Sequence, residues 1–386
     1  MKKIAKLSLV AAVAVAGLST SAMADTLAEA FANSKVKGEI KSQYFQKETK
    51  AGVESSIWSN GGNLSLTTGS FYGLTAGVTF QTGHVATDDN VAAYNGDMNA
   101  SGSVMSEAYL AYTLGNTTAK VGRQYISTPL VAGSGSRMFK QSFEGAVLIN
   151  TDIPNTVLVA AYVDKFQHRT STDADATVIG DAPKFRQVAD GAYTVYAKNT
   201  SIPNLAIQAQ YAHIEEGSAN VGEDVKAVYL DADYKLSPVT ISAQTFQTDN
   251  GAATNSDGKL YGIKVAGNVA GISAVAAYTT TDDEAAVVNG LGSGADKSYT
   301  ASPIRGGIYT ADTDSYRVGL GYKFAMGLGL NASYTNWDAA GADDDSETNV
   351  TASYAFNKNL STKIMYSKFD GLAQDYRSRV YLSYKF

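Results

Sequence analysis

Apolar and polar residues alternate with a period of two along almost the whole of this 386-residue chain, and no other feature restricts its possible folds as strongly. Such alternation is typical of β-strands that bury one face. It predicts 18 strands: Ser34–Lys47, Gly62–Gly69, Leu74–His84, Val104–Gly115, Thr117–Ile126, Glu144–Asp152, Thr156–His168, Gly191–Thr200, Leu205–Ile214, Val225–Leu236, Val239–Thr248, Lys259–Gly267, Ile272–Thr281, Ser315–Ala325, Leu328–Asp338, Thr348–Asn357, Leu360–Phe369 and Tyr376–Phe386.

The connections between these strands are alternately short and long. Every second connection is a turn of a few residues, such as LGN or LSP, and the others are longer and polar, such as those near 48–61, 127–143 and 282–314. All six prolines fall in connections. Proline cannot donate to a strand ladder, so its positions support the strand map independently. TLAEAFANS, before the first strand, predicts one short helical turn.

The N-terminus has the three parts of a secretory signal peptide. MKKIAK is basic, LSLVAAVAVAGL is an apolar run of 12 residues, and Ala22-Met23-Ala24 fits a small-x-small cleavage site. The apolar run is shorter than the roughly 18 residues that a membrane-spanning helix needs. We therefore expect residues 1–24 to be removed and residues 25–386 to form a single domain, since no break in composition divides them.

Composition excludes several classes of function. The chain has no cysteine, so disulfides and thiolate chemistry are absent. Without Lys2, Lys3 and Lys6, 28 of the 31 Lys and Arg residues remain against 37 Asp and Glu, a net charge of −9. No basic block offers a surface for nucleic acid. We expect no cofactor and no metal.

The strands can bury their apolar faces in two ways, inside a soluble sandwich or solenoid, or outside a barrel against lipid. Export, strands of about ten residues, alternating turn lengths and an even strand number favour a transmembrane antiparallel β-barrel with short periplasmic turns and long extracellular loops. Charged residues such as Arg317, Lys323, Asp231 and Asp233 fall on the second face, which a water-filled lumen can hold and a protein core cannot.

The C-terminus fits the same fold. The last strand alternates through Tyr384 to a terminal Phe386, which would pair with the first strand and lie near the periplasmic rim. We expect Tyr384 and Phe386 to form the signal that the barrel-assembly machinery reads. Trp58 and Trp337, at loop-side strand ends, predict aromatic anchors at the membrane interface.

A wide polar barrel predicts a passive pore, and one connection stands out as its constriction. Residues 127–143, STPLVAGSGSRMFKQSF, carry apolar residues that an exposed loop seldom needs, so we expect this loop to fold into the barrel. The expected pore-lining residues are Lys37, Lys41, Glu107, Arg123, Arg137, Lys140, Asp231, Asp233, Arg317 and Lys323. Simple alternation puts Arg123 on the lipid face, but a bulge could turn it into the lumen.

Several segments resemble a known family. SKVKGEIKSQYF, KVGRQY, TPLVAGSGSRMF and IPNTVLVAAYV are similar to OprD-type outer-membrane porins, most of all to the major outer-membrane porins of epsilonproteobacteria. The resemblance implies an 18-stranded barrel, often a homotrimer, whose third extracellular loop, here 127–143, folds inward. It also implies passage of small solutes, without fixing which ones or whether cations or anions are preferred.

The leading hypothesis is therefore a non-enzymatic porin of the Gram-negative outer membrane, in contact with its lipid and lipopolysaccharide, for passive diffusion of ions and small hydrophilic solutes. A surface adhesin or structural barrel is the alternative. A barrel hydrolase using His213 is less favoured, because no ordered serine motif accompanies that histidine. The acidic loop 339–349 lacks the spacing of a defined calcium site.

Overall fold

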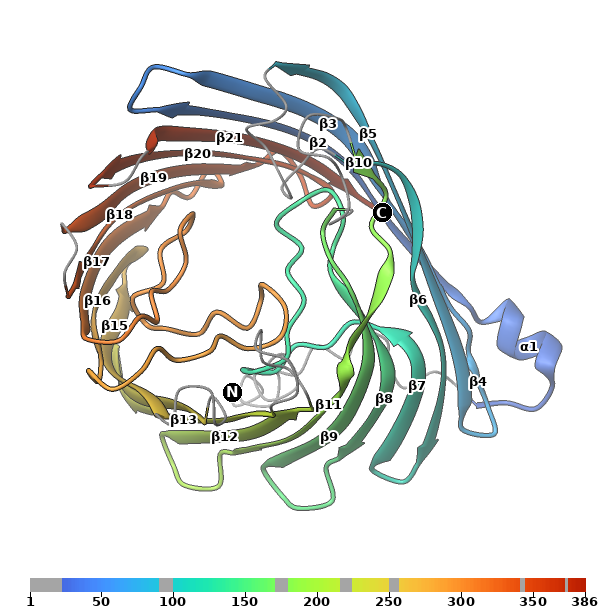
Figure 1. Ribbon diagram of the computed structural model, residues 1–386. Helices are drawn as coiled ribbons and strands as arrows, with labels where there is room; N and C mark the ends of the chain where they lie inside the picture. Colours follow the sequence, from blue (N-terminus) through green and yellow to red (C-terminus); the bar gives the residue numbers. More distant parts are fainter. Residues whose placement is uncertain are drawn as a thin grey trace.

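A computed structural model describes residues 23–89, 100–170, 180–215, 224–249, 257–340, 344–371 and 374–386. Within these ranges, 18 long strands form one sheet that closes into a barrel (Figure 1). The strands are β2 (Lys35–Thr49), β3 (Glu54–Thr67), β5 (Leu74–Asp89), β6 (Ala100–Leu114), β7 (Thr117–Gln124), β8 (Ser142–Asn150), β9 (Thr156–Gln167), β11 (Phe185–Asn199), β12 (Leu205–Ile214), β13 (Val225–Leu236), β14 (Val239–Asp249), β15 (Asp257–Val269), β16 (Ile272–Thr281), β17 (Thr313–Lys323), β18 (Leu328–Ala339), β19 (Asp345–Ala355), β20 (Leu360–Asp370) and β21 (Gln374–Lys385).

Each long strand pairs antiparallel with the next, and the last pairs with the first. Ile40 of β2 lies opposite Tyr384 of β21, which closes the ring. The main chains of Gly38 and Phe386 exchange two hydrogen bonds of 3.0 Å at this seam. Closure leaves no strand edge open to lipid, where unpaired backbone groups would be costly. The predicted fold class is confirmed.

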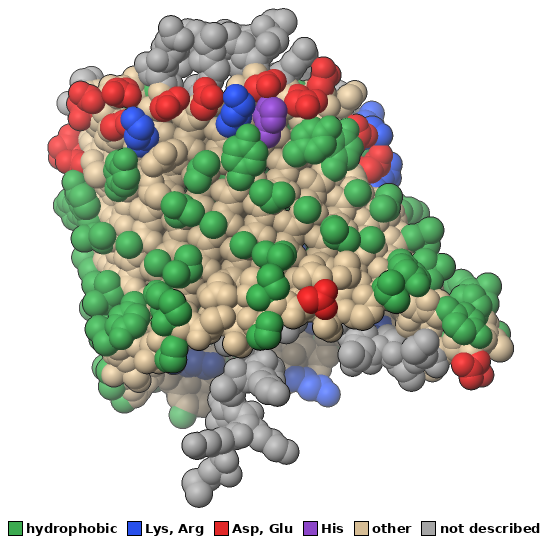
Figure 2. Space-filling view, turned by 90° about the horizontal axis from the view of Figure 1, so that it is seen from below, with side chains coloured by type: hydrophobic (Ala, Val, Ile, Leu, Met, Phe, Trp, Pro, Cys, Tyr) green, Lys and Arg blue, Asp and Glu red, His purple; other side chains and the backbone are tan. Residues whose placement is uncertain are grey.

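The two faces of the wall differ as the alternation predicts. Large apolar side chains such as Ile263 and Leu320 point outward and are 62% and 65% exposed. Figure 2 shows them spread over the outer wall, with acidic and basic side chains gathered along one rim. An apolar band with charged edges is the surface that a bilayer requires of a barrel. The outer wall is thus the lipid-facing surface.

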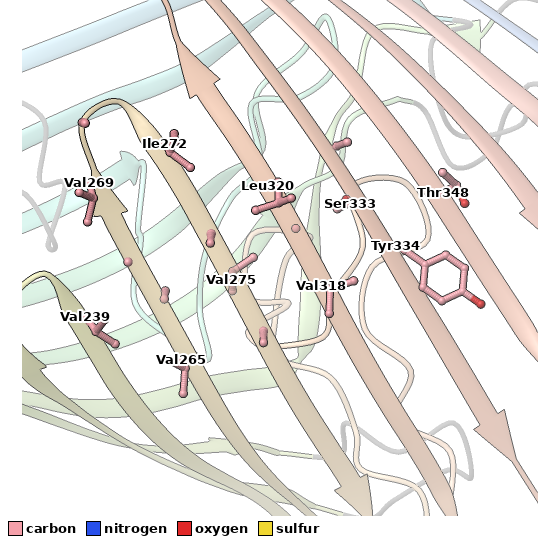
Figure 3. A pocket seen from close by; sticks show the side chains of 17 residues that line it. Val239, Val265, Val269, Ile272, Val275, Val318, Leu320, Ser333, Tyr334 and Thr348 are labelled. Carbon is pink, nitrogen blue, oxygen red and sulfur yellow. The ribbon is translucent and has the colours of Figure 1, made fainter.

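The outer wall also carries an apolar recess of about 770 Å³ between β14 and β19 (Figure 3). Small side chains, among them Ala274 and Ala276 of β16, form its floor, and larger ones such as Val265 and Leu320 stand around it. Its lining is almost wholly aliphatic. The recess therefore belongs to the membrane-facing surface and not to a solute site.

Three short strands and one helix complete the described chain. They are β1 (Met23–Ala24), β4 (Ser70–Phe71), β10 (Gly180–Asp181) and α1 (Leu27–Ala32). The predicted helical turn is confirmed as α1, which Thr26 and Glu29 cap reciprocally and which lies outside the ring beside β4 (Figure 1). No helix in the described ranges is long and apolar enough to cross a membrane.

Two sequence-based predictions of local structure are wrong. The strand expected to begin at Gly62 begins at Glu54, because residues 54–61, expected in the connection 48–61, pair with β2. A Cβ on Gly62 would come within 2.0 Å of the Glu39 carbonyl oxygen, so glycine serves close strand approach here. Trp337, expected at the membrane interface, faces inward and is 1% exposed.

Candidate functional site

The connection between β7 and β8, residues 125–141, runs inside the ring of strands (Figure 1), and we call it the first inner loop. It contains the predicted constriction segment 127–143 except Ser142 and Phe143, which belong to β8. Its apolar residues Leu130, Val131, Met138 and Phe139 are each at most 2% exposed. Burial of four apolar side chains holds the loop against the inner wall.

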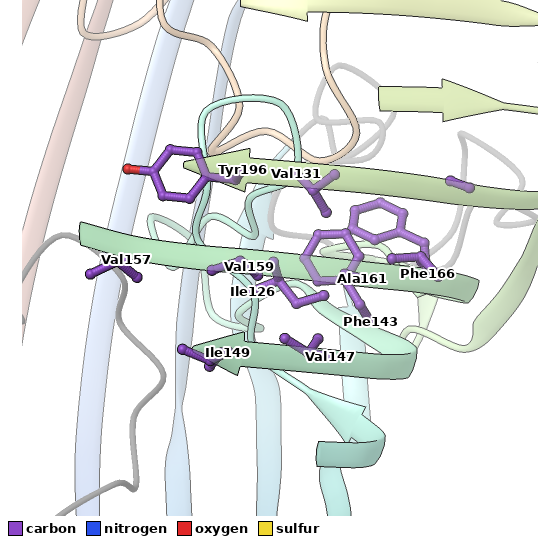
Figure 4. Close-up of a cluster of buried hydrophobic side chains, with 12 residues drawn as sticks. Ile126, Val131, Phe143, Val147, Ile149, Val157, Val159, Ala161, Phe166 and Tyr196 are labelled. Atoms are coloured by element: carbon purple, nitrogen blue, oxygen red, sulfur yellow. The ribbon is translucent and has the colours of Figure 1, made fainter. Parts of the chain in front are cut away.

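The inner wall beside this loop is apolar, unlike most of the lumen. Val147, Val159 and Phe166, from β8 and β9, face inward and cluster with Ile126 and Val131 of the loop (Figure 4). Both faces of these strands are therefore apolar, one toward lipid and one toward the loop. Without the loop, this inner patch would be exposed to water.

Polar side chains of three distant strands fix the backbone of the first inner loop. The Lys41 ammonium of β2 donates to the carbonyl oxygen of Met138 at 2.9 Å. The Gln81 amide of β5 binds both the N–H and the C=O of Lys140, at 2.8 and 2.9 Å. Gln210 of β12 accepts from the Leu130 N–H at 2.7 Å. These bonds satisfy loop backbone groups that burial removes from water.

A second long connection, residues 282–312 between β16 and β17, also lies inside the ring (Figure 1), and we call it the second inner loop. The two inner loops meet. Val131 and Leu291 form a parallel bridge, with the Leu291 N–H donating to the Leu130 carbonyl at 2.8 Å. The Gln141 amide donates to Ser293 Oγ at 3.1 Å. The loops therefore form one continuous partition across part of the lumen.

The second inner loop is held by the opposite part of the wall. The Tyr299 hydroxyl donates to the Asp231 carboxylate of β13, which also accepts from the Gln208 amide at 3.0 Å. Arg317 of β17 donates to the Ala301 carbonyl oxygen. Two of the residues expected to line the pore, Asp231 and Arg317, thus position this loop.

A carboxylate at the far end anchors the same loop. Glu347 of β19 accepts from the Ser302 hydroxyl at 2.6 Å and from the Arg305 N–H at 3.1 Å. The Arg305 guanidinium pairs with Asp345 and lies 5.1 Å from the Trp337 ring centre. Trp337 shares the inward face of β18 with the buried Thr335, and this contact covers its ring.

Basic side chains concentrate on one side of the lumen. Lys41, Arg137 and Lys140 come from β2 and the first inner loop, Lys363 and Arg379 from β20 and β21, and Lys120 from β7. Arg137 and Arg379 both lie over the Phe45 ring, with their guanidinium carbons 5.3 and 4.7 Å from its centre. We call these six residues the cationic wall.

Acidic neighbours and burial both affect the charges of the cationic wall. Glu107 is its nearest acidic neighbour, with a carboxylate oxygen 3.7 Å from Lys120 Nζ and a bond of 2.6 Å from the Thr79 hydroxyl. Burial lowers the pKa of the Lys140 ammonium, an effect that Glu107 and Glu39 oppose. Basic groups nevertheless outnumber acidic ones there.

The acidic residues of β13 lie across the lumen from the cationic wall. Counted from β2 around the ring, β13 is the tenth of 18 strands, so Asp231 and Asp233 lie on the far side. Asp233 accepts a hydrogen bond from the Ser242 hydroxyl. Lys37 and Lys323 have lumen-facing parity, are exposed and lie toward the short-turn end, away from the inner loops.

Arg123 is not in the lumen, and the prediction that a bulge turns it inward is wrong. It pairs across strands with Ala108 and Glu144, on the same face as Val121, which is 60% exposed to the outside. Its Nε lies 2.8 Å from a Glu144 oxygen, and Lys165 Nζ lies 2.7 Å from the other. These ion pairs let a basic residue occupy the outer face.

Sequence reasoning missed four features of the lumen: Lys120, Lys363, Arg379 and the whole second inner loop. The three basic residues lie at inward positions of correctly predicted strands, so alternation alone could have found them. The loop offered a weaker signal, Tyr299 and Tyr309 within a polar segment, and both tyrosines are largely removed from solvent.

No cluster suited to a metal ion occurs in the described part of the chain. No group of three or more His, Asp or Glu side chains converges there. His213 lies at the rim, with its Nε2 2.9 Å from an Asp224 oxygen. The acidic loop 339–349 lies partly outside the described residues, because 341–343 are not among them.

A closed barrel with a lipid-facing apolar wall, a polar lumen and inward-folded loops defines the class of outer-membrane channels. The sequence profile described as "outer membrane porin, OprD family" matches residues 31–336, most of the chain. The chain belongs to the OprD family of outer-membrane porins, which is a class of channels and not of enzymes. No protein with a curated description matches the sequence.

Three solved structures of similar fold, from two organisms, illustrate the likeness. OccAB1 of Acinetobacter baumannii superposes with a TM-score of 0.76 at 16% identity, covering 95% of this chain and 99% of that one. OpdO of Pseudomonas aeruginosa gives 0.73 at 16% identity, with 93% and 98% covered. OpdK of Pseudomonas aeruginosa, solved with vanillate, gives 0.72 at 13% identity, with 92% and 99% covered. At these identities the likeness concerns the fold.

Proposed function

We propose that this porin passes small hydrophilic solutes by diffusion through a constriction formed by both inner loops, and that its cationic wall favours carboxylate-bearing solutes. The first inner loop carries Arg137 and Lys140 of the cationic wall and meets the second inner loop at Val131 and Gln141, and this arrangement is the observation that carries the proposal. Arg137, Arg379 and Lys363 come from three segments and are close enough to affect one another electrostatically. A confined cluster of like charges attracts solutes of the opposite charge.

The distribution of charged residues produces an electric field across the pore at the constriction. Basic groups stand on the β20–β21–β2 side and the carboxylates of Asp231 and Asp233 on the β13 side. A solute with a carboxylate and a polar remainder would be oriented by this field as it passes. Vanillate, which is bound in the OpdK structure, is an aromatic carboxylate, and its chemistry fits this preference.

The test is ion selectivity in a planar bilayer across a KCl gradient. The substitutions Arg137→Ala and Lys140→Ala together should shift the reversal potential toward cations and change the permeability ratio by roughly twofold or more. The anchoring bonds involve the backbone of Arg137 and Lys140 and the side chains of Lys41 and Gln81, so the loop should keep its position.

A matched control removes the same charge elsewhere in the lumen. Lys37→Ala with Lys323→Ala also deletes two cations from inward positions, but far from the inner loops. The shift in reversal potential of this control should be clearly smaller than that of the Arg137→Ala/Lys140→Ala variant. Equal shifts from the two double variants would mean that the filter does not lie at the inner loops, and absence of channels would contradict the proposal.

Export and assembly complete the proposed function. Residues 1–22 lie outside the described residues, and cleavage after Ala24 stays a prediction, with Asp25 as the expected first residue. N-terminal sequencing of protein purified from outer membranes checks it, and retention of Met1 would contradict it. A homotrimer also stays a proposal. The apolar recess between β14 and β19 supports it as a surface with room for larger side chains of a second copy.

A further inference from the structure

The barrel wall has a notch at its extracellular end, above β7 and β8. The chain leaves the wall after Gln124 and returns at Ser142, while the flanking β6 and β9 extend farther. Residues 180–185 cross this notch. β10 pairs in parallel with the start of β6, and Phe185 pairs with Gln167 of β9 (Figure 1). The notch exists because residues 125–141 fold into the lumen as the first inner loop and do not extend β7 and β8 along the wall.

A groove of about 720 Å³ lies beneath this crossing segment. Three of its lining residues are basic and none is acidic, and the lining includes Ser103, Met105, Arg123, Lys165, Lys184 and Phe185. The lining therefore combines positive charge with apolar side chains. This combination differs from the recess between β14 and β19, whose lining has no charged residue.

The groove opens toward the membrane and not toward the lumen. Arg123 and Lys165 each lie directly opposite Glu144 in the strand register, so all three side chains share one face. That face also carries Val121 and Leu148, which are 60% and 47% exposed. The long connections mark the extracellular side. The groove is therefore at the level where headgroups of the outer leaflet lie.

The basic groups of the groove are fixed in position but keep donors available. Glu144 holds Arg123 through Nε and Lys165 through Nζ, and Lys165 Nζ also lies 3.3 Å from an Asp164 oxygen. A guanidinium has five N–H donors, and the second hydrogen bond of Arg123 is a long one, 3.4 Å from Nη1 to the Met105 carbonyl oxygen. Its carbon lies 4.3 Å from the Phe185 ring centre. A planar guanidinium fixed in this way suits bidentate binding of phosphate.

Lys184 adds an exposed ammonium on the segment that crosses the notch. With Arg123 and Lys165 it gives three cations against Glu144 and Asp164, so the local balance is positive. The exposed apolar wall at Val121 and Leu148 continues from the groove toward the membrane centre. A ligand that matches both the positively charged groove and the apolar wall beside it has an anionic headgroup and hydrocarbon tails.

We propose that this groove is a binding site for the phosphorylated headgroup of an outer-leaflet glycolipid, of the lipid A type, whose acyl chains lie over Val121 and Leu148. Arg123 and Lys184 contact the phosphate, and Lys165 with Glu144 keeps Arg123 in place. The site requires only that the barrel spans the outer membrane. It is independent of which solutes cross the pore.

Native mass spectrometry of the purified full-length mature protein tests the proposal. The probes are bisphosphorylated lipid A, the same glycolipid with both phosphates removed, and inorganic phosphate. Arg123→Gln with Lys184→Gln should weaken binding of bisphosphorylated lipid A roughly tenfold, since charge-assisted hydrogen bonds are lost. The dephosphorylated glycolipid should bind equally weakly to both proteins, and inorganic phosphate more weakly still.

A control variant removes two outward-facing cations from the same rim. Lys226→Gln with Lys259→Gln lies on β13 and β15, far from the notch, and should leave the affinity within about twofold. Equal affinity of the wild-type protein and the Arg123/Lys184 variant for bisphosphorylated lipid A would overturn the proposal. Equal affinity of the wild-type protein for the dephosphorylated glycolipid, or for inorganic phosphate, would overturn it as well. Resistance to heat unfolding verifies that each variant is folded.

Discussion

Removal of residues 288–308, with Val287 joined to Tyr309 through two glycines, is expected to raise the single-channel conductance at least about twofold, because the free cross-section of the lumen increases. The structure allows this deletion. The Val287 N–H donates to the Tyr309 carbonyl at 2.8 Å, so the two ends of the removed segment already lie together. Val287 and Tyr309 also stay packed with Leu130 of the first inner loop and with Phe246 and Leu260 of the inner wall.

The control shortens a loop that does not enter the lumen. Replacing the exposed tip 50–52 between β2 and β3 with two glycines should leave the conductance unchanged. The deletion should also increase current noise, since Leu291 no longer pairs with the backbone of the first inner loop. Both quantities come from recordings of single channels in planar bilayers. An unchanged conductance would show that the first inner loop alone limits the pore.

The strands could be predicted from sequence because each depends on a local pattern. Alternation with period two sets the face of every residue, and the prolines confirm where strands stop. The glycines of β3 show the limit of this logic. Gly61 was expected at the end of a connection, yet it lies inside β3 and serves close contact, since a Cβ on Gly61 would come within 2.2 Å of the Thr82 carbonyl oxygen and 2.8 Å of Met138 Sδ.

The inward position of the first inner loop can be predicted from its sequence, and that of the second cannot. The first carries Leu130, Val131, Met138 and Phe139, and apolar residues in a long connection point to packing. The second is mostly polar and Gly-rich, and its inward position depends on hydrogen bonds to residues far along the chain, as from Tyr299 to Asp231. Contacts of this kind have no local periodicity. They appear only when the closed ring brings the strands around the loop.

Arg123 shows the converse error. Alternation placed it on the lipid face, and the cost of a charge there, about 2–4 kcal/mol at the bilayer centre, argued for turning it inward. The partner that removes this difficulty, Glu144, lies 21 residues farther along, directly opposite in the register of β7 and β8. Alternation assigned Arg123 to the correct face, but it does not give the register of β7 and β8, which brings Glu144 opposite Arg123. The same pair then fixes the groove at the notch.

Phe386→Ala is expected to lower the amount of folded protein in the outer membrane roughly tenfold, because the last side chain covers the seam of the barrel. The Phe386 ring occupies the space above Gly38, where an added Cβ would lie 2.3 Å from the ring. Removing Phe386 altogether should have a larger effect, since the two 3.0 Å backbone hydrogen bonds with Gly38 are also lost. Unpaired backbone groups at a lipid-facing seam cost several kcal/mol each.

Phe356 provides a matched control for this prediction. It directly follows β19 as Phe386 directly follows β21, it is 55% exposed against 53%, and it contacts Tyr354 as Phe386 contacts Tyr384. Phe356→Ala removes an equivalent aromatic side chain from a seam that is not the closing one, so the amount of assembled protein should stay near the wild-type level. Heat-modifiable migration of outer-membrane fractions measures the folded amount. Equal losses of folded protein for Phe356→Ala and Phe386→Ala would show that the aromatic rim in general supports assembly. A loss of folded protein for Phe386→Ala alone would show that the terminal residue controls the closure of β21 on β2.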